Sequence, residues 1–169
     1  NGEVTKLEFD GTYVLDISPV RAFKALSDLR CNGNGRTGML ADLSPLQGMN
    51  LTFLSCAISR VKDLSPLRGM LLNTLNVSYS MVDDISPLEG MPLNELNLIS
   101  TQVSSLPPLT GSSIVTLRIS NTRVSDISLL PAFNKLVLLQ ARNTQITSSS
   151  FAALQKALPN CKIEWDDPA

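Results

Sequence analysis

A five-residue pattern recurs along this chain at one fixed interval, and this repetition limits the possible folds more than any other feature. The copies begin at residues 42, 63, 84, 105 and 126, each 21 residues after the one before, and read DLSPL, DLSPL, DISPL, SLPPL and DISLL. An earlier copy, DISPV, begins at residue 16. A period in the twenties is typical of a solenoid, in which each unit buries its apolar face against its neighbours.

Each copy has the features of a short helical turn. Proline has a fixed φ and no N–H group, which suits the first position of such a turn. The serine before it can cap the turn by accepting a hydrogen bond from a free N–H group. Apolar residues three positions apart, such as Ile85 and Leu88, lie on one face of a tight turn. We expect that face to point into the core.

A second pattern, Leu-x-Leu, begins nine residues before each turn, except that an insertion lengthens this distance to 13 residues between Leu29 and Asp42. Its central copies begin at residues 54, 75, 96 and 117, again 21 apart, and similar segments begin at residues 7, 29 and 139. Alternation with a period of two predicts strands with one buried and one exposed face. Because a return segment containing the turn separates successive strands, we expect the strands to be parallel.

The two patterns together resemble the leucine-rich repeat family, specifically its internalin-like bacterial class. The resemblance covers nearly the whole chain and is clearest at residues 114–128. It implies an α/β repeat solenoid, a horseshoe with a parallel β-sheet on its concave face and 3-10 turns on its convex face. The chain departs from the family where an asparagine ladder is usual, because hydroxyl residues stand there: Thr12, Ser59, Ser80, Thr101, Thr122 and Thr144.

We predict one leucine-rich repeat domain over residues 1–169. The expected repeats span approximately residues 1–25, 26–50, 51–71, 72–92, 93–113, 114–135 and 136–158, and a cap spans 159–169. Three serines from residue 148, followed by apolar residues at helical spacing, predict a short helix that ends at Pro159. A cap strand with Trp165 follows. This ending also resembles the closing cap of repeat domains that bacterial proteins join to a serine/threonine kinase, which implies such an association.

Composition argues against several functions. The chain has 14 Lys and Arg against 15 Asp and Glu, so nucleic acid is not an expected partner. It has no histidine, which removes the usual general base and zinc ligand. The three cysteines lack metal-ligand spacing, and we predict that Cys31 and Cys56 are core thiols. No run approaches the roughly 20 apolar residues of a membrane span. We therefore predict a non-enzymatic protein without a cofactor or metal, and without direct membrane insertion of this segment.

Two further motifs have structural interpretations. Residues 33–38, GNGRTG, match the dinucleotide fingerprint, which requires a helix at the last glycine and an acidic residue about 20 positions later. A repeat turn follows instead, and position 58 is isoleucine, so we expect a loop at the rim. The recurring aspartates are expected to accept backbone N–H groups rather than to hold cations.

The outward strand positions carry the functional prediction. Most are polar, but an apolar strip is formed by Phe53, Ile58, Tyr79 and Ile99, with arginines on one side of it and acids on the other. Aromatic and arginine side chains within a polar rim are typical of protein interfaces. We predict that the concave face binds a protein or peptide through Phe53, Ile58, Tyr79, Asn97, Ile99, Arg118 and Arg142.

A structural spacer or self-assembly module is the alternative function. The chain begins inside a repeat, so we expect it to come from a longer bacterial protein. Its first repeat has no capping helix before it and would expose apolar surface suited to self-association. The sequence leaves the cellular compartment open, and an extracytoplasmic or cell-envelope location is compatible with a sensing role.

Overall fold

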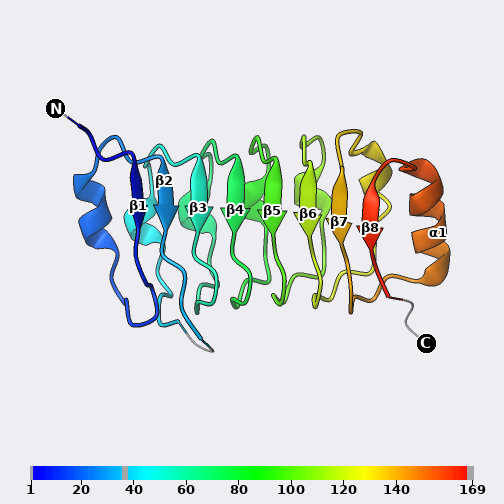
Figure 1. Cartoon of the computed structure of the whole chain (residues 1–169), viewed down its shortest axis with the longest axis horizontal. Helices are drawn as coiled ribbons and strands as arrows, with labels where there is room; N and C mark the ends of the chain where they lie inside the picture. Colours follow the sequence, from blue (N-terminus) through cyan, green and yellow to red (C-terminus); the bar gives the residue numbers. More distant parts are fainter. Residues whose placement is uncertain (1, 36–37, 167–169) are drawn as a thin grey trace.

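Eight strands of three residues each lie side by side in chain order and form one parallel sheet (Figure 1). The computed structural model describes residues 2–35 and 38–166. Each Leu-x-Leu segment pairs with the next, which confirms the predicted parallel sheet. The strands are β1 Lys6–Glu8, β2 Asp28–Arg30, β3 Phe53–Ser55, β4 Thr74–Asn76, β5 Glu95–Asn97, β6 Thr116–Arg118, β7 Leu138–Gln140 and β8 Lys162–Glu164.

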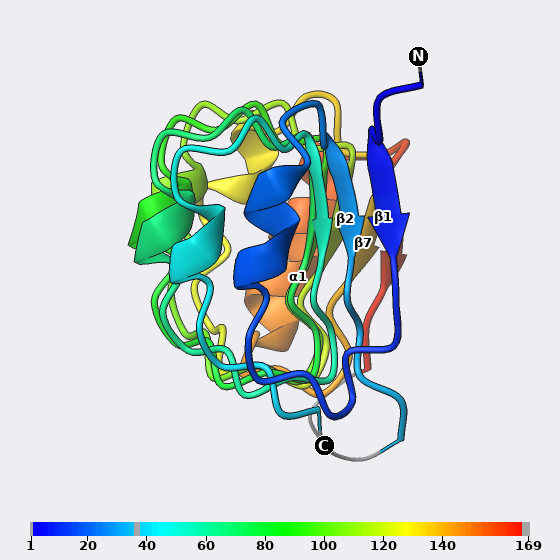
Figure 2. The same ribbon diagram turned by 90° about the vertical axis from the view of Figure 1, so that its left-hand side faces the viewer.

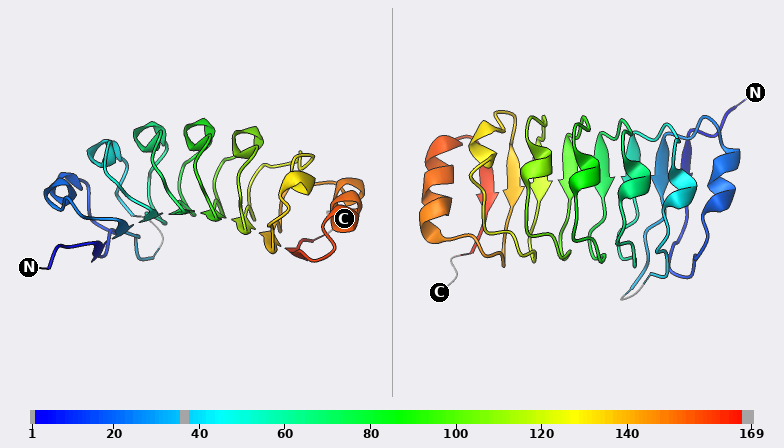
Figure 3. Two further views of the ribbon diagram at one scale, coloured as in Figure 1. Left: turned by 90° about the horizontal axis from the view of Figure 1, so that it is seen from above. Right: turned by 180° about the vertical axis from the view of Figure 1, so that it is seen from behind.

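Short 3-10 helices form the side opposite the sheet (Figure 2). In Figure 3 the strands follow the inner curve of an arc and the 3-10 helices follow its outer curve. The predicted horseshoe, with its sheet on the concave face, is therefore confirmed. The 3-10 helices are η1 Ser18–Ala22, η2 Ser44–Leu46, η3 Ser65–Leu67, η4 Ser86–Leu88, η5 Pro107–Leu109 and η6 Leu130–Ala132.

The core is a continuous column of aliphatic side chains between these two sides. On the convex side, Ile85 and Leu88 are buried, as their spacing predicted. Cys31 and Cys56 are buried in the same column and are not joined in a disulfide, which confirms them as core thiols. The central residue of every strand from β2 to β7 is a buried leucine: Leu29, Leu54, Leu75, Leu96, Leu117 and Leu139.

The recurring aspartate, and not the serine, holds the convex turns except at η5, where Ser105 stands in the aspartate position. Asp63 accepts the Ser65 N–H through Oδ1 and the Ser65 hydroxyl through Oδ2, both at 2.8 Å. The N-cap of this turn is Leu64, and the Ser65 hydroxyl donates to Asp63, so the predicted serine cap was wrong. The physical reason is that the nearby carboxylate is a stronger acceptor and takes the hydroxyl proton. Equivalent N–H bonds to Asp16, Asp42, Asp84 and Asp126 confirm the structural role of these carboxylates.

Except for Thr12, the hydroxyl residues at the ladder position form hydrogen bonds with the backbone of their own repeat. The Thr101 and Thr122 hydroxyls donate to the carbonyl groups of Leu98 and Ile119, at 2.7 and 2.6 Å. The Ser80 hydroxyl instead accepts the Val82 N–H at 3.4 Å. These hydroxyl residues are buried apart from Thr144, which is half-buried. The Thr12 hydroxyl differs from the others, because it accepts the Asn34 N–H of the next repeat at 2.6 Å.

A residue in the left-handed conformation turns the chain away from the sheet in five consecutive repeats. Side chains with a Cβ rarely adopt this conformation, and isoleucine is among the least suited to it. The glycines that close the other edge, such as Gly69 at φ 76°, have the positive φ expected for them. The five residues are Ile58 (φ 52°), Tyr79 (φ 55°), Ser100 (φ 56°), Asn121 (φ 57°) and Asn143 (φ 50°).

The two ends of the column differ. Helix α1 (Ser148–Ala157) closes the C-terminal end, and its N-cap is Thr147, whose hydroxyl accepts the Ser150 N–H at 3.3 Å. The Trp165 ring stacks on Phe151 with centroids 4.1 Å apart, as expected of a residue that covers the core. At the other end Val4, Tyr13 and Leu15 are exposed. No helix in the described part of the chain has the length and apolar character needed to cross a membrane.

Candidate functional site

The concave face consists of the side chains that alternate with the buried leucines. Strand register aligns them in rows that run across the sheet. One row contains the last residue of each strand, and its members from β3 to β6 are Ser55, Asn76, Asn97 and Arg118. The first residue of each strand forms a parallel row, which includes Phe53, Thr74 and Glu95. A partner on this face would therefore meet ordered rows of side chains and not a cleft.

Arg30 links the charged β2 strand to the aromatic ring of β3. Its guanidinium Nε lies 3.1 Å from an Asp28 carboxylate oxygen, and this hydrogen bond raises the pKa of Arg30. The guanidinium carbon also lies 4.1 Å from the centroid of the Phe53 ring. A cation over an aromatic face attracts the ring and holds both side chains in place. Phe53 itself is half-buried.

A chain of amide hydrogen bonds continues across β2, β3 and β4. Asn32 Oδ1 accepts the Ser55 hydroxyl at 2.7 Å and the Ala57 N–H at 2.9 Å. Asn76 donates to the Ser55 hydroxyl at 3.1 Å, and its Oδ1 accepts the Ser78 N–H at 3.1 Å. These side chains are therefore held in one orientation before any partner arrives, which lowers the entropy lost on binding.

The seven residues predicted to bind lie in three places. Asn97 and Arg118 share a register position on adjacent strands, and both are half-buried. Phe53 begins β3, whereas Ile58 and Tyr79 occupy the left-handed turns beyond β3 and β4. Ile58 is five positions after Phe53, so at about 3.3 Å per residue the two side chains lie on opposite margins of the sheet.

The predicted apolar strip is therefore divided between two margins. Tyr79 is 57% exposed at the turn margin. Ile99 and Arg142 lie just beyond the ends of β5 and β7, closer to this margin than Phe53 is. The Arg30 contact to Phe53 and the amide chain through Asn76 were not predicted. The strand register contained the signal for the amide chain, because it aligns Ser55 with Asn76.

Comparison with solved structures agrees with this geometry. An internalin of Listeria monocytogenes, InlF, has a TM-score of 0.81 at 27% identity, over 96% of this chain and 48% of that chain. Internalin C2 of the same organism has a TM-score of 0.68 at 24% identity, over 96% and 81% of the two chains. A leucine-rich repeat protein of Leptospira interrogans has a TM-score of 0.55 at 16% identity, over 94% and 54%. The fold is an internalin-like leucine-rich repeat horseshoe.

The present leucine-rich repeat chain spans about half the length of InlF. No protein-family model matches its sequence, and a comparison with curated proteins found no match. The likeness therefore concerns the fold.

The core cysteines of the horseshoe have the environment of inert thiols. Burial raises the pKa of Cys31 to about 12, and burial also raises the pKa of Cys56. A protonated thiol is a weak nucleophile and a weak metal ligand. Among residues 2–35 and 38–166, no group of three or more His, Cys, Asp or Glu side chains is placed to hold a metal ion.

The glycines of the loop at residues 33–38 have a packing role. A Cβ on Gly33 or Gly38 would lie 2.3 or 2.0 Å from the carbonyl oxygen of Ile58, so only glycine allows this approach. No helix begins at Gly38, as the contextual test for a nucleotide site would require. Arg36 and Thr37, the rest of the fingerprint match, lie outside the described residues.

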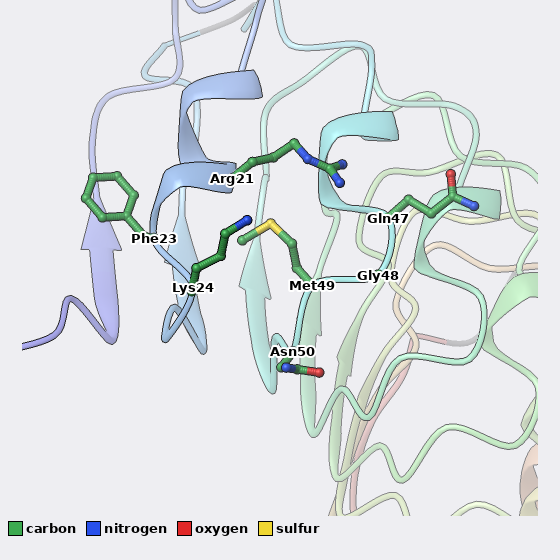
Figure 4. A pocket seen from close by; sticks show the side chains of 7 residues that line it. All are labelled: Arg21, Phe23, Lys24, Gln47, Gly48, Met49 and Asn50. Atoms are coloured by element: carbon green, nitrogen blue, oxygen red, sulfur yellow. The ribbon is translucent and has the colours of Figure 1, made fainter.

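The hollows of the leucine-rich repeat surface lie among the return segments. One hollow, between η1 and η2, has a volume of about 140 Å³. Figure 4 shows the residues that line it, which are Arg21, Phe23, Lys24 and residues 47–50. Arg21 crosses to η2 and donates to the Pro45 carbonyl at 3.0 Å. This volume is below the roughly 300 Å³ usual for a small-molecule pocket. We therefore assign the hollow a structural role in joining repeats.

Proposed function

We propose that this chain is a protein interaction domain that binds a protein or peptide on the concave face of its sheet. The observation that carries the proposal is the preorganised set of side chains between β2 and β4. Arg30 holds Phe53, and the amide chain holds Asn76. Fixed aromatic and polar anchors favour association because little side-chain freedom remains to be lost. The internalin-like fold supports the same function.

The test is capture of a partner by variants that change one face at a time. Phe53→Ala/Tyr79→Ala alters the concave face and its turn margin. Gln47→Ala/Glu89→Ala removes two exposed side chains at the ends of η2 and η4 and serves as the matched convex control. Circular dichroism first establishes that both variants fold as the wild type does.

We expect the wild type and the convex control to retain the same protein from a lysate and an envelope extract of the source cells, and the concave variant to lose it. Quantitative cross-linking of that protein would then map its contacts to β2–β6. Equal retention by all three forms would overturn the concave site. If the wild type retains no protein even from purified extracts at high concentration, that result would count against the interaction function itself.

Self-association is a second candidate, favoured by one observation. In the chain as given, the first repeat exposes Val4, Tyr13 and Leu15, which are 40%, 85% and 64% accessible. An apolar group of this kind is suited to a second copy or a neighbouring segment. Sedimentation of Tyr13→Ser/Leu15→Ser and of the wild type tests this candidate. Only self-association through this repeat predicts that the variant sediments with a lower mass than the wild type.

The remaining expectations stay predictions. They include the absence of catalysis, the absence of a nucleic-acid partner, and membership in a larger bacterial protein that contains a kinase.

A further inference from the structure

The lysines of the edge strands β1 and β8 form ion pairs with an acid of their own strand. Lys6 and Glu8 of β1 lie 3.7 Å apart, and Lys162 and Glu164 of β8 lie 2.7 Å apart. In each of these strands the acid is two residues from the base, which places both side chains on the same face. The Asp28 and Arg30 pair of β2 follows the same rule. The concave face thus contains a repeated pattern of internal ion pairs.

Arg118 and Arg142 depart from this pattern. The residues two positions from Arg118 are Thr116 and Ser120, and the residue two before Arg142 is Gln140. In the described part of the chain neither guanidinium has a carboxylate oxygen within 4.0 Å. An arginine has five N–H donors and no acceptor, so both side chains retain their capacity to bind an anion.

The register brings these two arginines together. Arg118 of β6 pairs with Gln140 of β7, and Arg142 lies two residues beyond Gln140. The Arg142 N–H donates to the Ser120 hydroxyl at 3.1 Å, so pairing continues past the end of β7. Diagonal neighbours on one face of a sheet are roughly 7 to 8 Å apart at Cα, within reach of one carboxylate for two long side chains.

Asn97 supplies a third donor beside Arg118. The two residues share a register position on β5 and β6. Asn97 Oδ1 accepts the Ile99 N–H at 3.1 Å, which fixes the amide and leaves its Nδ2 group as a donor. Donors from three repeats therefore face one region of the concave surface.

Two acids near this region limit the kind of anion it suits. Glu164 accepts hydrogen bonds from Lys162 and from Gln140, and these bonds, with the charge of Arg142, lower its pKa. Glu95 pairs in register with Thr116 and lies diagonal to Arg118. Arg118, Arg142 and Lys162 against these two acids leave one net positive charge in the region, which suits single carboxylates better than a multiply charged phosphate or a nucleic acid.

We infer that Arg118, Arg142 and the Asn97 amide form a subsite that recognises a carboxylate side chain of an acidic segment in the partner protein. This inference rests on the proposed function, since it assigns the partner's chemistry at the same face. Arginine suits the role because its planar fork matches a carboxylate in two parallel hydrogen bonds.

The test uses fluorescein-labelled octapeptides and fluorescence anisotropy at low salt. The probes are an all-glutamate peptide, an all-glutamine peptide and an all-lysine peptide. The test variant is Arg118→Gln/Arg142→Gln. Arg60→Gln/Arg123→Gln is the matched control, because it changes the net charge equally at exposed positions beyond the turn margin.

We expect the wild type to bind the glutamate peptide in preference to the other two. The test variant should bind it about three- to tenfold more weakly, which corresponds to the loss of two exposed ion pairs. The control variant should match the wild type, and added salt should weaken binding because it screens exposed charges. Equal losses in both variants, or equal binding of all three peptides, would overturn the inference.

The peptide result separates this inference from the proposed function. If partner capture depends on Phe53 and Tyr79 but is unchanged in Arg118→Gln/Arg142→Gln, the face binds a protein and the carboxylate subsite is wrong. Tighter binding of a phosphoserine octapeptide than of the glutamate peptide would likewise reject the carboxylate assignment. Failure of every concave variant to alter capture, with the peptide preference intact, would count against the proposed function alone.

Discussion

At the scale of single residues, the turn margin stores backbone strain that can be measured. Tyr79 has a φ of 55° and a side chain that is 57% exposed, so its conformation costs energy while its ring gains little from burial. We expect Tyr79→Gly to be more stable than Tyr79→Val by about 1 to 2 kcal/mol, because only glycine adopts the left-handed region freely. Urea denaturation of the two variants measures this difference.

Thr74 provides the matched control for this prediction. It lies in β4, where the backbone is extended and β-branched residues are favoured. The order should therefore reverse, with Thr74→Val more stable than Thr74→Gly. The same order at both positions would show that glycine acts through a general effect on the unfolded chain and not through relief of strain at Tyr79.

At the scale of the repeat, the cost of a core substitution should depend on where the layer lies. Leu96 is 0% exposed between two complete layers, whereas Leu7 is half-buried in the edge strand β1. Leu96→Ala is expected to lower the free energy of unfolding by about 2 to 5 kcal/mol, and Leu7→Ala by clearly less, because the end layer leaves a smaller cavity. Chemical denaturation tests this order, and Glu95→Ala, an exposed change in the same strand, should have an effect near zero.

The element scale also shows what the sequence could predict. The interval of 21 residues determined the register from β3 to β6, because the same leucine returns to the same place in each of these layers. It did not reveal where each strand ends. Ile58 and Tyr79 were interpreted as outward strand positions, yet they occupy left-handed turns although both residue types have high β propensity. Local propensity is overridden there by the need of the chain to turn at the same point in every repeat.

The candidate site was predictable in part for the same reason. Alternation correctly placed Asn97 and Arg118 on the exposed face. The contact of Arg30 with Phe53 joins repeats separated by an insertion, so the simple period of 21 does not align them. The predicted serine caps were wrong for a different reason. The sequence shows an aspartate and a serine two residues apart, but it does not show which side chain accepts the N–H group of the turn.

At the scale of the whole molecule, the convex turns should make the solenoid sensitive to acid. Hydrogen bonds from the serine two residues later lower the pKa of Asp16, Asp63, Asp84 and Asp126. A carboxyl group with a folded pKa below its unfolded value, about 3.9, stabilises the fold above that value. Its contribution is lost as the pH falls through the folded pKa. We expect constant stability from pH 7 to about 5 and a progressive loss below about pH 4.

The variant Asp63→Asn/Asp84→Asn tests whether the repeated turn causes this loss. An asparagine Oδ1 still accepts the serine N–H but does not titrate in this range, so the variant should be less stable at pH 7 and lose less stability on acidification. Thermal unfolding at pH 7, 5, 4, 3 and 2 gives both quantities, and Glu89→Gln on the convex side should follow the wild type. If the pH profile of the aspartate variant is unchanged, the acid-sensitive groups lie instead at the ends of the solenoid, where Asp10 and Glu164 also have lowered pKa values. In that case acid would open the solenoid from its ends, whereas titration of the central turns would weaken several adjacent layers together.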